Sequence, residues 1–213
     1  MALNVIRYLT DPDYRAVKRW KWAKGDDVLR YSVPIPSGGV ILDVGAYIGD
    51  FAQGMAERTQ GIIHAFEPVE AFAAQCRVRV QRFPQIHVHA YGLSNRDETA
   101  RISLDGLGSS QYRAADNSVE AKFRDIVPVL QELNIDTIAL AKLNIEGGEY
   151  DVLPRLIEAG LMERVSALMV QFHRTHADAE DRYDAIATAL AKTHALQWRY
   201  PFIWELWLRK AGQ

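Results

Sequence analysis

Short apolar runs alternate along the chain with longer stretches in which apolar residues recur every three or four positions. Compact runs rich in Val, Ile and Leu are typical of strands buried on both faces, whereas the longer spacing is typical of helices with one buried face. The alternation therefore predicts an α/β fold in which helices connect parallel strands. The predicted strands are 40–42, 62–66, 86–91, 137–145 and 165–172, with an additional strand at 99–104 and helices at 50–60, 69–83, from 125, from 148 and at 177–193.

A glycine-containing turn joins the first predicted strand to the helix that begins at Asp50. The sequence of this turn, from Asp43 to Gly49, is DVGAYIG. Glycine lets the chain turn sharply and lets a ligand approach bare backbone. The helix that follows offers free N–H groups and the positive end of a dipole at its N-terminus. We therefore expect this turn to form one wall of a ligand site.

Glu67 ends the second predicted strand. It follows the turn by about 20 residues, the spacing at which an acidic side chain accepts hydrogen bonds from ribose hydroxyls. The two features predict a nucleoside site at the C-terminal edge of a parallel sheet. A dinucleotide site needs a glycine where this chain has Tyr47, because the pyrophosphate approaches the backbone there. S-adenosylmethionine carries no phosphate, so we favour it as the cofactor. A nicotinamide-dependent oxidoreductase is the alternative.

Further polar residues stand at the ends of predicted strands, where a parallel sheet places them beside the cofactor. Asn144 and Glu146 follow the fourth strand, next to the position expected for the departing methyl group. His173 ends the fifth strand and is a candidate general base, although a histidine at a strand end is about as often a surface hydrogen-bonding group. Ser94 follows the third strand near the expected adenine ring, either as a contact to the base or as an ordinary turn residue.

Two segments outside these strands are candidates for contacting the methyl acceptor. Residues 105–111 carry two glycines and two serines, which predicts a flexible loop that closes over the substrate or serves only as a linker. The N-terminal segment, 1–37, is predicted to form one or two helices. Its aromatic residues Trp20, Trp22 and Tyr31 either cover the site or fix the segment to the sheet.

Bulk composition narrows the class of protein. A length of 213 residues suits a single domain, predicted over residues 1–213 with a helical cap segment at 1–37 and a core at 38–213. The net charge of −2 gives no electrostatic reason to expect nucleic acid or an anionic membrane as a partner. Cys76 is the single cysteine, and neither a metal-ligating cluster nor a signal peptide or membrane span is predicted. We therefore expect a cytoplasmic enzyme.

Taken in order, the motifs resemble those of a known enzyme family. LDVGAYIGDF followed by AFEP is similar to the first motif and acidic loop of class I methyltransferases. KLNIEGGEYDVL at 142–153 resembles the K-x-D-x-E-G-x-E-x-x-V-L signature of the FkbM family, with GLGSSQ at 106–111 and VQFH at 170–173 in the family's order. The resemblance implies a single doubly wound, Rossmann-like, mostly parallel seven-stranded sheet with helices on both faces. It also implies a C-terminal antiparallel hairpin, here at 196–200 and 202–209.

The resemblance further implies methyl transfer from S-adenosylmethionine, most often to a hydroxyl of a sugar or small natural product. Glu146 and Glu149 match acids of the family signature, and Glu149 also falls in the first turn of a predicted helix, where the helix dipole accounts for an acid. The family has aspartate in place of Asn144 and glutamate in place of Gln171. Without those two acids, Glu146 or His173 must act as the base, or the substrate is an amine or already ionised. A non-catalytic cofactor-binding protein is the remaining alternative.

These arguments define a predicted site without a metal. The predicted cofactor-binding residues are Asp43, Gly45, Ala46, Tyr47, Gly49, Glu67, Pro68, Leu93 and Ser94. The predicted catalytic residues are Glu146, His173 and Asn144, and the candidate residues for the small-molecule acceptor are Ser109, Ser110 and Tyr31.

Overall fold

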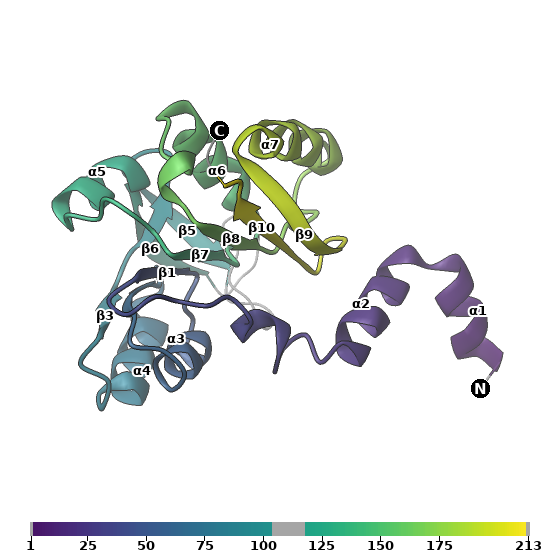
Figure 1. The fold of residues 1–213 in the computed structure, drawn as a ribbon, viewed down its shortest axis with the longest axis horizontal. Coiled ribbons are helices and arrows are strands. Elements are labelled where there is room, and N and C mark those ends of the chain that lie inside the picture. The colour runs from purple at the N-terminus through teal and green to yellow at the C-terminus, as the bar shows by residue number, and fades with distance from the viewer. Residues whose placement is uncertain (1, 104–117, 212–213) are drawn as a thin grey trace.

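The computed structural model describes residues 2–103 and 118–211 (Figure 1). Within these residues, one seven-stranded sheet has the order β3-β2-β1-β7-β8-β10-β9. Neighbouring strands are parallel from β3 to β8, whereas β10 is antiparallel to both of its neighbours. The strands are β1 (Val40–Val44), β2 (Ile62–Phe66), β3 (Ile86–His89), β7 (Leu140–Leu143), β8 (Ala167–Val170), β9 (His194–Tyr200) and β10 (Trp204–Arg209).

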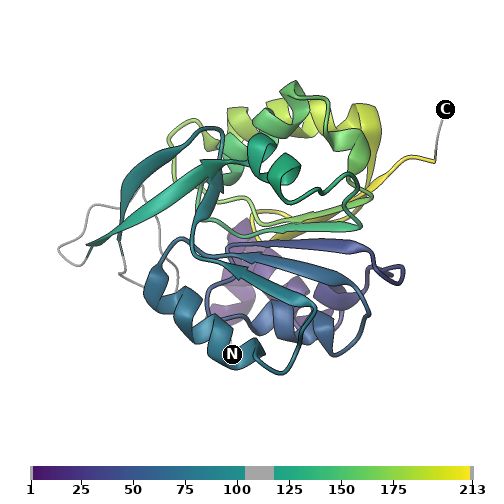
Figure 2. The same ribbon diagram turned by 90° about the vertical axis from the view of Figure 1, so that its left-hand side faces the viewer.

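Helices cover both faces of this sheet, and Figure 2 shows the three layers edge-on. One face is covered by α3 (Asp50–Ala56) and α4 (Glu70–Val80), and the other by α5 (Ile126–Glu132), α6 (Glu149–Glu158) and α7 (Ala179–Thr193). Each face buries its own apolar cluster. The predicted fold class, a doubly wound, mostly parallel sheet with a C-terminal antiparallel hairpin, is confirmed.

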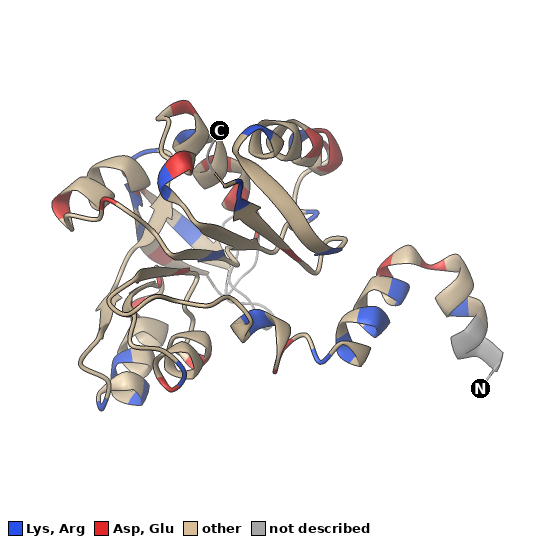
Figure 3. Cartoon of the chain, in the orientation of Figure 1, with Lys and Arg blue, Asp and Glu red and all other residues tan. Residues whose placement is uncertain are grey.

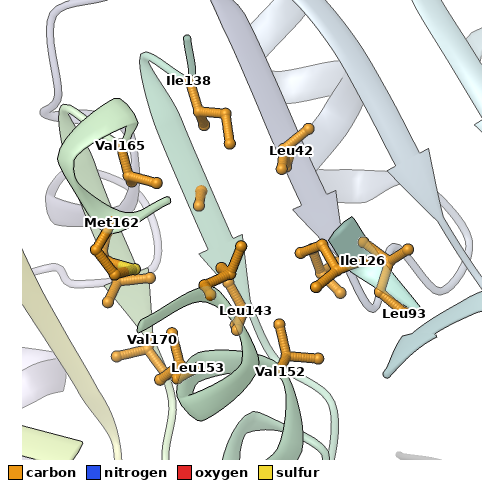
Figure 4. Packing of buried hydrophobic residues seen from close by; sticks show 14 of the residues in the cluster. Leu42, Leu93, Ile126, Ile138, Leu143, Val152, Leu153, Met162, Val165 and Val170 are labelled. Carbon is orange, nitrogen blue, oxygen red and sulfur yellow. The ribbon is translucent and has the colours of Figure 1, made fainter. Parts of the chain in front are cut away.

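The alternation of side chains along β1 separates the two clusters. Ile41 packs with the α3 and α4 side, whereas Leu42 and Val44 pack with α5, α6 and α7, because successive side chains of a strand point to opposite faces. Figure 4 shows the cluster on the side of α5, α6 and α7, to which Leu42 of β1 and Leu143 of the neighbouring strand both contribute. A central strand buried on both faces explains why the motif begins with an uninterrupted apolar run.

The predicted fourth and fifth strands are shorter in the structure than in the sequence pattern. The pattern at 137–145 becomes β7 at Leu140–Leu143, with Ile138 forming an isolated bridge to Val165 before β8 begins. Apolar residues continue past the strand ends because the connecting backbone is itself covered by helices. Hydrophobicity therefore overestimates strand length at this edge.

A second, three-stranded sheet lies beside the C-terminal ends of the main strands. It has the order β4-β6-β5, formed by β4 (Gly92–Ser94), β5 (Glu98–Ser103) and β6 (Ser118–Asp125). The additional strand predicted at 99–104 corresponds to β5, but it does not extend the main sheet. The loop predicted at 105–111 lies outside the described residues.

The N-terminal segment forms α1 (Ala2–Thr10), α2 (Pro12–Trp22) and a short 3-10 turn, η1 (Leu29–Tyr31). Trp20 is buried and packs against the aromatic rings of Trp198, Tyr200 and Trp204 in the C-terminal hairpin, whereas Trp22 is 68% exposed. Trp20 thus fixes the segment to the edge of the sheet, as one of the two interpretations of these aromatics expected. Among the described residues no helix has the length and apolar character needed to cross a membrane.

A buried ion pair joins the two central strands. Lys142 Nζ on β7 donates hydrogen bonds to Asp43 Oδ1 on β1 at 2.8 Å and to the Gly45 carbonyl at 2.9 Å. Both side chains are almost fully excluded from solvent. Burial lowers the pKa of Lys142, while the adjacent Asp43 carboxylate opposes that shift. The pair therefore fixes the glycine turn to the neighbouring strand.

We expect Lys142→Met to destabilise the fold by about 3–5 kcal/mol, because it leaves the Asp43 charge buried without its partner. Urea denaturation would measure this loss. Arg77→Met is the control, since it removes one member of an exposed pair with Glu70 and should cost at most about 1 kcal/mol. Equal effects of the two substitutions would contradict the role given to the buried pair.

Two histidines share a hydrogen bond on the outer strands of the sheet. His64 Nδ1 on β2 lies 3.0 Å from His89 Nε2 on β3, so one ring donates and the other accepts. Burial lowers the pKa of both rings to about 4, and the nearby His87 adds to the shift. Both rings are therefore neutral at neutral pH in the folded protein.

This arrangement predicts a loss of stability in mild acid. The unfolded chain takes up protons on these histidines below about pH 6.5 while the folded chain does not, so the free energy of unfolding should fall between about pH 6.5 and 4. Urea denaturation at several pH values would measure the slope. The double substitution His64→Gln, His89→Gln should make that slope shallower. An identical slope in both proteins would contradict this assignment.

Candidate active site

A pocket opens at the C-terminal ends of β1, β2 and β7, where the sequence placed the ligand site. Its walls come from the turns after these strands and from the three-stranded sheet. The residues that line it are Val44, Gly45, Tyr47, Glu67, Pro68, Gly92, Leu93, Ser94, Ile102, Phe123, Asn144, Ile145, Glu146 and Gly148.

The turn after β1 is held by backbone contacts. The N–H groups of Gly45 and Ala46 both donate to the Phe66 carbonyl at 3.0 Å, which joins the turn to the end of β2. Gly45 has a φ of 80°, and a Cβ atom at this position would lie 2.1 Å from the Asn144 carbonyl oxygen. Tyr47 also has a positive φ, 51°, although it is not glycine. Such strain is concentrated in functional sites, and Tyr47 lines the pocket.

Glu67 is the buried acid of this pocket. Its Oε2 accepts a hydrogen bond from the Tyr47 N–H at 2.8 Å, and its Oε1 accepts one from the Val69 N–H at 2.9 Å. Burial raises the pKa of Glu67 from 4.5 to about 7, against the opposing effect of these two hydrogen bonds. Each carboxylate oxygen retains a further lone pair that can accept a hydrogen bond from a ligand.

Apolar side chains form the wall next to Glu67. Leu93 belongs to β4, while Ile102 and Phe123 belong to β5 and β6. Gly92 allows the Phe123 ring to approach, since a Cβ atom at Gly92 would lie 2.5 Å from that ring. A flat aromatic base such as adenine suits a wall of this kind.

The opposite wall contains polar groups from the turn after β7. Asn144 Oδ1 is buried and has no hydrogen-bond partner among the described residues. Glu146 has a φ of 50°, a second non-glycine residue in the left-handed region that lines the pocket. An unpaired buried acceptor is costly unless a ligand donates to it. Because Asn144 lines the pocket, we propose that a donor group of a bound ligand hydrogen-bonds to this oxygen.

His173 lies beside this wall in the segment that follows β8. Its Nδ1 lies 3.1 Å from Glu149 Oε1, and its Nε2 lies 3.5 Å from Glu146 Oε1. The structure thus brings the imidazole next to the pocket carboxylate Glu146. Gln171 donates its backbone N–H to the Leu143 carbonyl and does not line the pocket.

The predicted cofactor residues fall into two groups. Six line the pocket, namely Gly45, Tyr47, Glu67, Pro68, Leu93 and Ser94. The other three lie behind its wall: Asp43 pairs with Lys142, Ala46 is buried in the α3 and α4 cluster, and the Gly49 Cα faces Cys76. Their contacts support the turn from behind.

One candidate acceptor residue, Tyr31, lies away from this pocket. Tyr31 stacks on Phe51 with ring centroids 5.6 Å apart and packs against Gly54 of α3. It is not among the residues that line the pocket, and its contact with an acceptor stays a prediction. Ser109 and Ser110 lie outside the described residues. The described residues also contain no group of three or more His, Cys, Asp or Glu side chains placed to hold a metal ion.

Several residues of the site did not emerge from sequence reasoning. Ile102 and Phe123 form the apolar wall, and Phe123 belongs to a strand, β6, that was not predicted. Its alternation was readable, since Val119, Ala121 and Phe123 are apolar and the residues between them are charged. Lys142 lies inside an apolar run, where a lone lysine is a signal for a buried partner.

The fold and the pocket define a Rossmann-like nucleoside-binding enzyme of the methyltransferase class. Residues 43–212 match the sequence model of the methyltransferase FkbM domain, so the chain belongs to that family. It is an S-adenosylmethionine-dependent methyltransferase, which sets aside the nicotinamide alternative. A search of curated protein sequences gave no match.

Solved structures with low sequence identity share the fold. A candidate rRNA methylase from Clostridium thermocellum superposes with a TM-score of 0.56 at 10% identity, covering 90% of this chain and 97% of that one. Aeropyrum pernix fibrillarin, solved with bound S-adenosylmethionine, gives 0.51 at 10% identity over 87% and 74%. A Streptococcus mutans protein of the same general class, solved with S-adenosylhomocysteine, gives 0.51 at 8% identity over 88% and 97%.

The residues of the pocket fit this cofactor. Glu67 offers carboxylate oxygens to ribose hydroxyls, and the apolar wall of Leu93, Ile102 and Phe123 suits the adenine ring. The orphaned Asn144 Oδ1 requires a donor, which the ammonium group or an acceptor substrate supplies. We therefore propose that these residues would hold S-adenosylmethionine.

We predict that the affinity for S-adenosylhomocysteine depends on the charge of Glu67. Ribose hydroxyls donate to the ionised carboxylate, so the affinity should rise as the pH increases toward 7 and level off above about 8. Calorimetric titrations between pH 5.5 and 8 would measure this. Glu67→Gln should remove the pH dependence, and Glu67→Ala should weaken binding by about 100-fold or more through loss of two charge-assisted hydrogen bonds.

Unchanged affinity in the Glu67→Ala protein would contradict the site assignment. Glu70→Gln is the matched control, because Glu70 is an exposed acid three residues further along that does not line the pocket. It should bind the ligand with the pH dependence of the unmodified protein.

Proposed function

We propose that the chain methylates a hydroxyl group on a sugar or a small natural product. The observation that carries this proposal is the carboxylate of Glu146 in the pocket wall opposite Glu67, with the His173 imidazole 3.5 Å from it. A neutral hydroxyl must lose its proton as it is methylated, so its enzyme needs a base at the point of transfer. A neutral amine attacks through its lone pair and loses its proton only after transfer.

The residues of the pocket then take distinct roles. When bound, the cofactor supplies a sulfonium methyl group: the acceptor oxygen forms a bond to the methyl carbon as the carbon–sulfur bond breaks with its electron pair moving to sulfur. Glu146 accepts the hydroxyl proton through a carboxylate oxygen. Glu67 holds the ribose, which fixes the position of the cofactor relative to the opposite wall of the pocket. Orientation of this kind lowers the barrier because the reacting atoms are already aligned.

Asn144 takes a binding role in this scheme. Its amide oxygen accepts a hydrogen bond but cannot remove a proton at neutral pH, unlike the aspartate that the family signature has at this position. Glu146, which lies two residues further along the same turn, therefore acts as the general base. The positive φ of Glu146 supports this role, since such a strained conformation persists only where the surrounding structure fixes the backbone.

Charge supports a small molecule as the acceptor in preference to nucleic acid. The net charge is −2, and Figure 3 shows acidic and basic residues interspersed over the sheet domain, with basic residues along α2. Nucleic acid binding derives most of its affinity from phosphate contacts by clustered Lys and Arg. The fold similarity to a candidate rRNA methylase carries no information on this point, because fold is shared by enzymes with many acceptors.

We predict that Glu146→Gln lowers the rate of methyl transfer by about 100-fold to 10,000-fold while the affinity for S-adenosylhomocysteine changes less than about threefold. Transfer of tritium from labelled S-adenosylmethionine to a panel of sugars, phenols, alcohols, amines and rRNA would identify the acceptor class. Glu158→Gln, an exposed acid at the end of α6, is the control and should leave both quantities unchanged.

Two results would contradict the proposal. Transfer to amines or to rRNA with none to hydroxyl compounds would overturn the acceptor class. Full activity of Glu146→Gln on a hydroxyl acceptor would overturn the role of Glu146 as the base.

A further inference from the structure

Glu149 is a fully buried carboxylate in the first turn of α6, and its contacts exceed what a helix terminus requires. Its side chain is 0% exposed. Oε2 accepts a hydrogen bond from the Gly147 N–H at 2.9 Å, and Oε1 accepts one from the His173 N–H at 2.7 Å. Complementing a helix dipole does not require an acid to be buried. Glu149 is instead enclosed between two strand ends.

The two backbone contacts join segments that belong to neighbouring strands. Gly147 follows β7, in the turn that also carries Asn144 and Glu146, whereas His173 follows β8. The carboxylate thus ties the Glu146 turn to the His173 segment. Gly147 has a φ of 111°, a conformation that only glycine adopts readily. The N–H group that donates to Glu149 therefore comes from a backbone position that favours glycine.

The third contact involves the imidazole ring itself. His173 Nδ1 lies 3.1 Å from Glu149 Oε1, while Nε2 lies 3.5 Å from Glu146 Oε1. A carboxylate accepts but does not donate when ionised, so the proton of this contact belongs to Nδ1. In the neutral ring, Nε2 then carries the lone pair, and this nitrogen lies on the side of Glu146. One carboxylate therefore orients the ring, and the other faces its second nitrogen.

The charged surroundings of His173 come from several segments. Glu146 precedes α6 and Glu149 lies within it, while Arg174 adjoins His173 in the chain and pairs with Asp13 of α2. His176 lies nearby, in ring contact with Tyr150 at 6.0 Å. Arg174 is engaged with Asp13 and Glu180, whereas the carboxylates of Glu146 and Glu149 both lie within 3.5 Å of the ring.

We propose that Glu149 is a positioning residue that keeps the neutral His173 ring protonated on Nδ1, so that Nε2 receives the proton that Glu146 has taken from the acceptor. This inference rests on the proposed function for the role of Glu146. The acceptor proton moves to Glu146 and then to His173 Nε2. The imidazolium so formed is stabilised by the Glu149 carboxylate and releases its proton to solvent before the next turnover, while Glu146 returns to its ionised form. The relay requires no residue other than those three.

The unmodified protein provides the first test. Long-range proton–nitrogen spectra of protein labelled with nitrogen-15 distinguish a protonated from an unprotonated imidazole nitrogen, and a pH titration with S-adenosylhomocysteine bound would follow His173. Above its midpoint of titration, we expect the neutral ring to carry its proton on Nδ1. A neutral ring with its proton on Nε2, or one shared equally between the nitrogens, would overturn the proposal.

Variants supply the second test. In Glu149→Gln we expect the neutral ring to populate both tautomers and the midpoint of titration to fall by about one pH unit or more, because an anion that favours the charged ring is gone. The dissociation constant for S-adenosylhomocysteine should change less than about threefold. Glu158→Gln, on the same helix but exposed, should alter none of these quantities. An unchanged His173 titration and tautomer in Glu149→Gln would overturn the proposal.

These measurements separate the two levels of the argument. Failure of S-adenosylhomocysteine to bind would count against the pocket assignment, whereas the tautomer of His173 reports on Glu149 alone. If Glu149→Gln does not fold, the tautomer of His173 in the unmodified protein still tests the proposal. With an acceptor in hand, Glu149→Gln should lower kcat by about 100-fold or more with little change in the KM for the cofactor, and Glu149→Asp should recover part of that loss.

Discussion

The buried pair between Lys142 and Asp43 is the constraint on which the site depends. Two charges in the centre of the sheet are costly to desolvate, and they persist because each is the partner of the other across adjacent strands. Lys142 also donates to the Gly45 carbonyl. The glycine turn is thereby attached to β7 as well as β1, and the walls that carry Glu67 and Asn144 are held in a fixed relation. The pair joins residues 99 positions apart, so the two halves of the pocket form only when the sheet is complete.

Each of the two walls of the pocket carries a strained backbone position and polar groups. Tyr47 and Glu146 are both non-glycine residues with positive φ, one in each of the turns that face each other across the site. The surrounding hydrogen bonds stabilise these conformations: Tyr47 donates to Glu67, and Gly147, beside Glu146, donates to Glu149. Each strained turn is thus held by a buried carboxylate. In the proposed scheme, the same carboxylates, Glu67 and Glu149, act at the ligand end and at the proton-transfer end of the site.

The local pattern of the chain was sufficient to predict most of the fold. Strand β2 and the start of α3 fall where the sequence placed them, and α5 begins beside the predicted position 125, where Asp125 accepts a hydrogen bond from the Val127 N–H. The three-stranded sheet was only partly foreseen, because β4 has three residues and β6 depends on partners distant in sequence. Glu67 could be located from spacing alone. The role of Glu149 could not be predicted from the sequence. An acid in the first turn of a helix is already explained by the helix dipole, and the contact between Glu149 and His173 forms only when β7 and β8 align.

The most direct test of the account is a crystal structure of the protein with S-adenosylhomocysteine. The account predicts ribose hydroxyls hydrogen-bonded to Glu67, the adenine ring against Phe123 and Leu93, and the sulfur end of the ligand directed toward Asn144 and Glu146. A ligand bound with its ribose away from Glu67, or with its sulfur on the side of the pocket far from Glu146, would contradict the assignment of both walls.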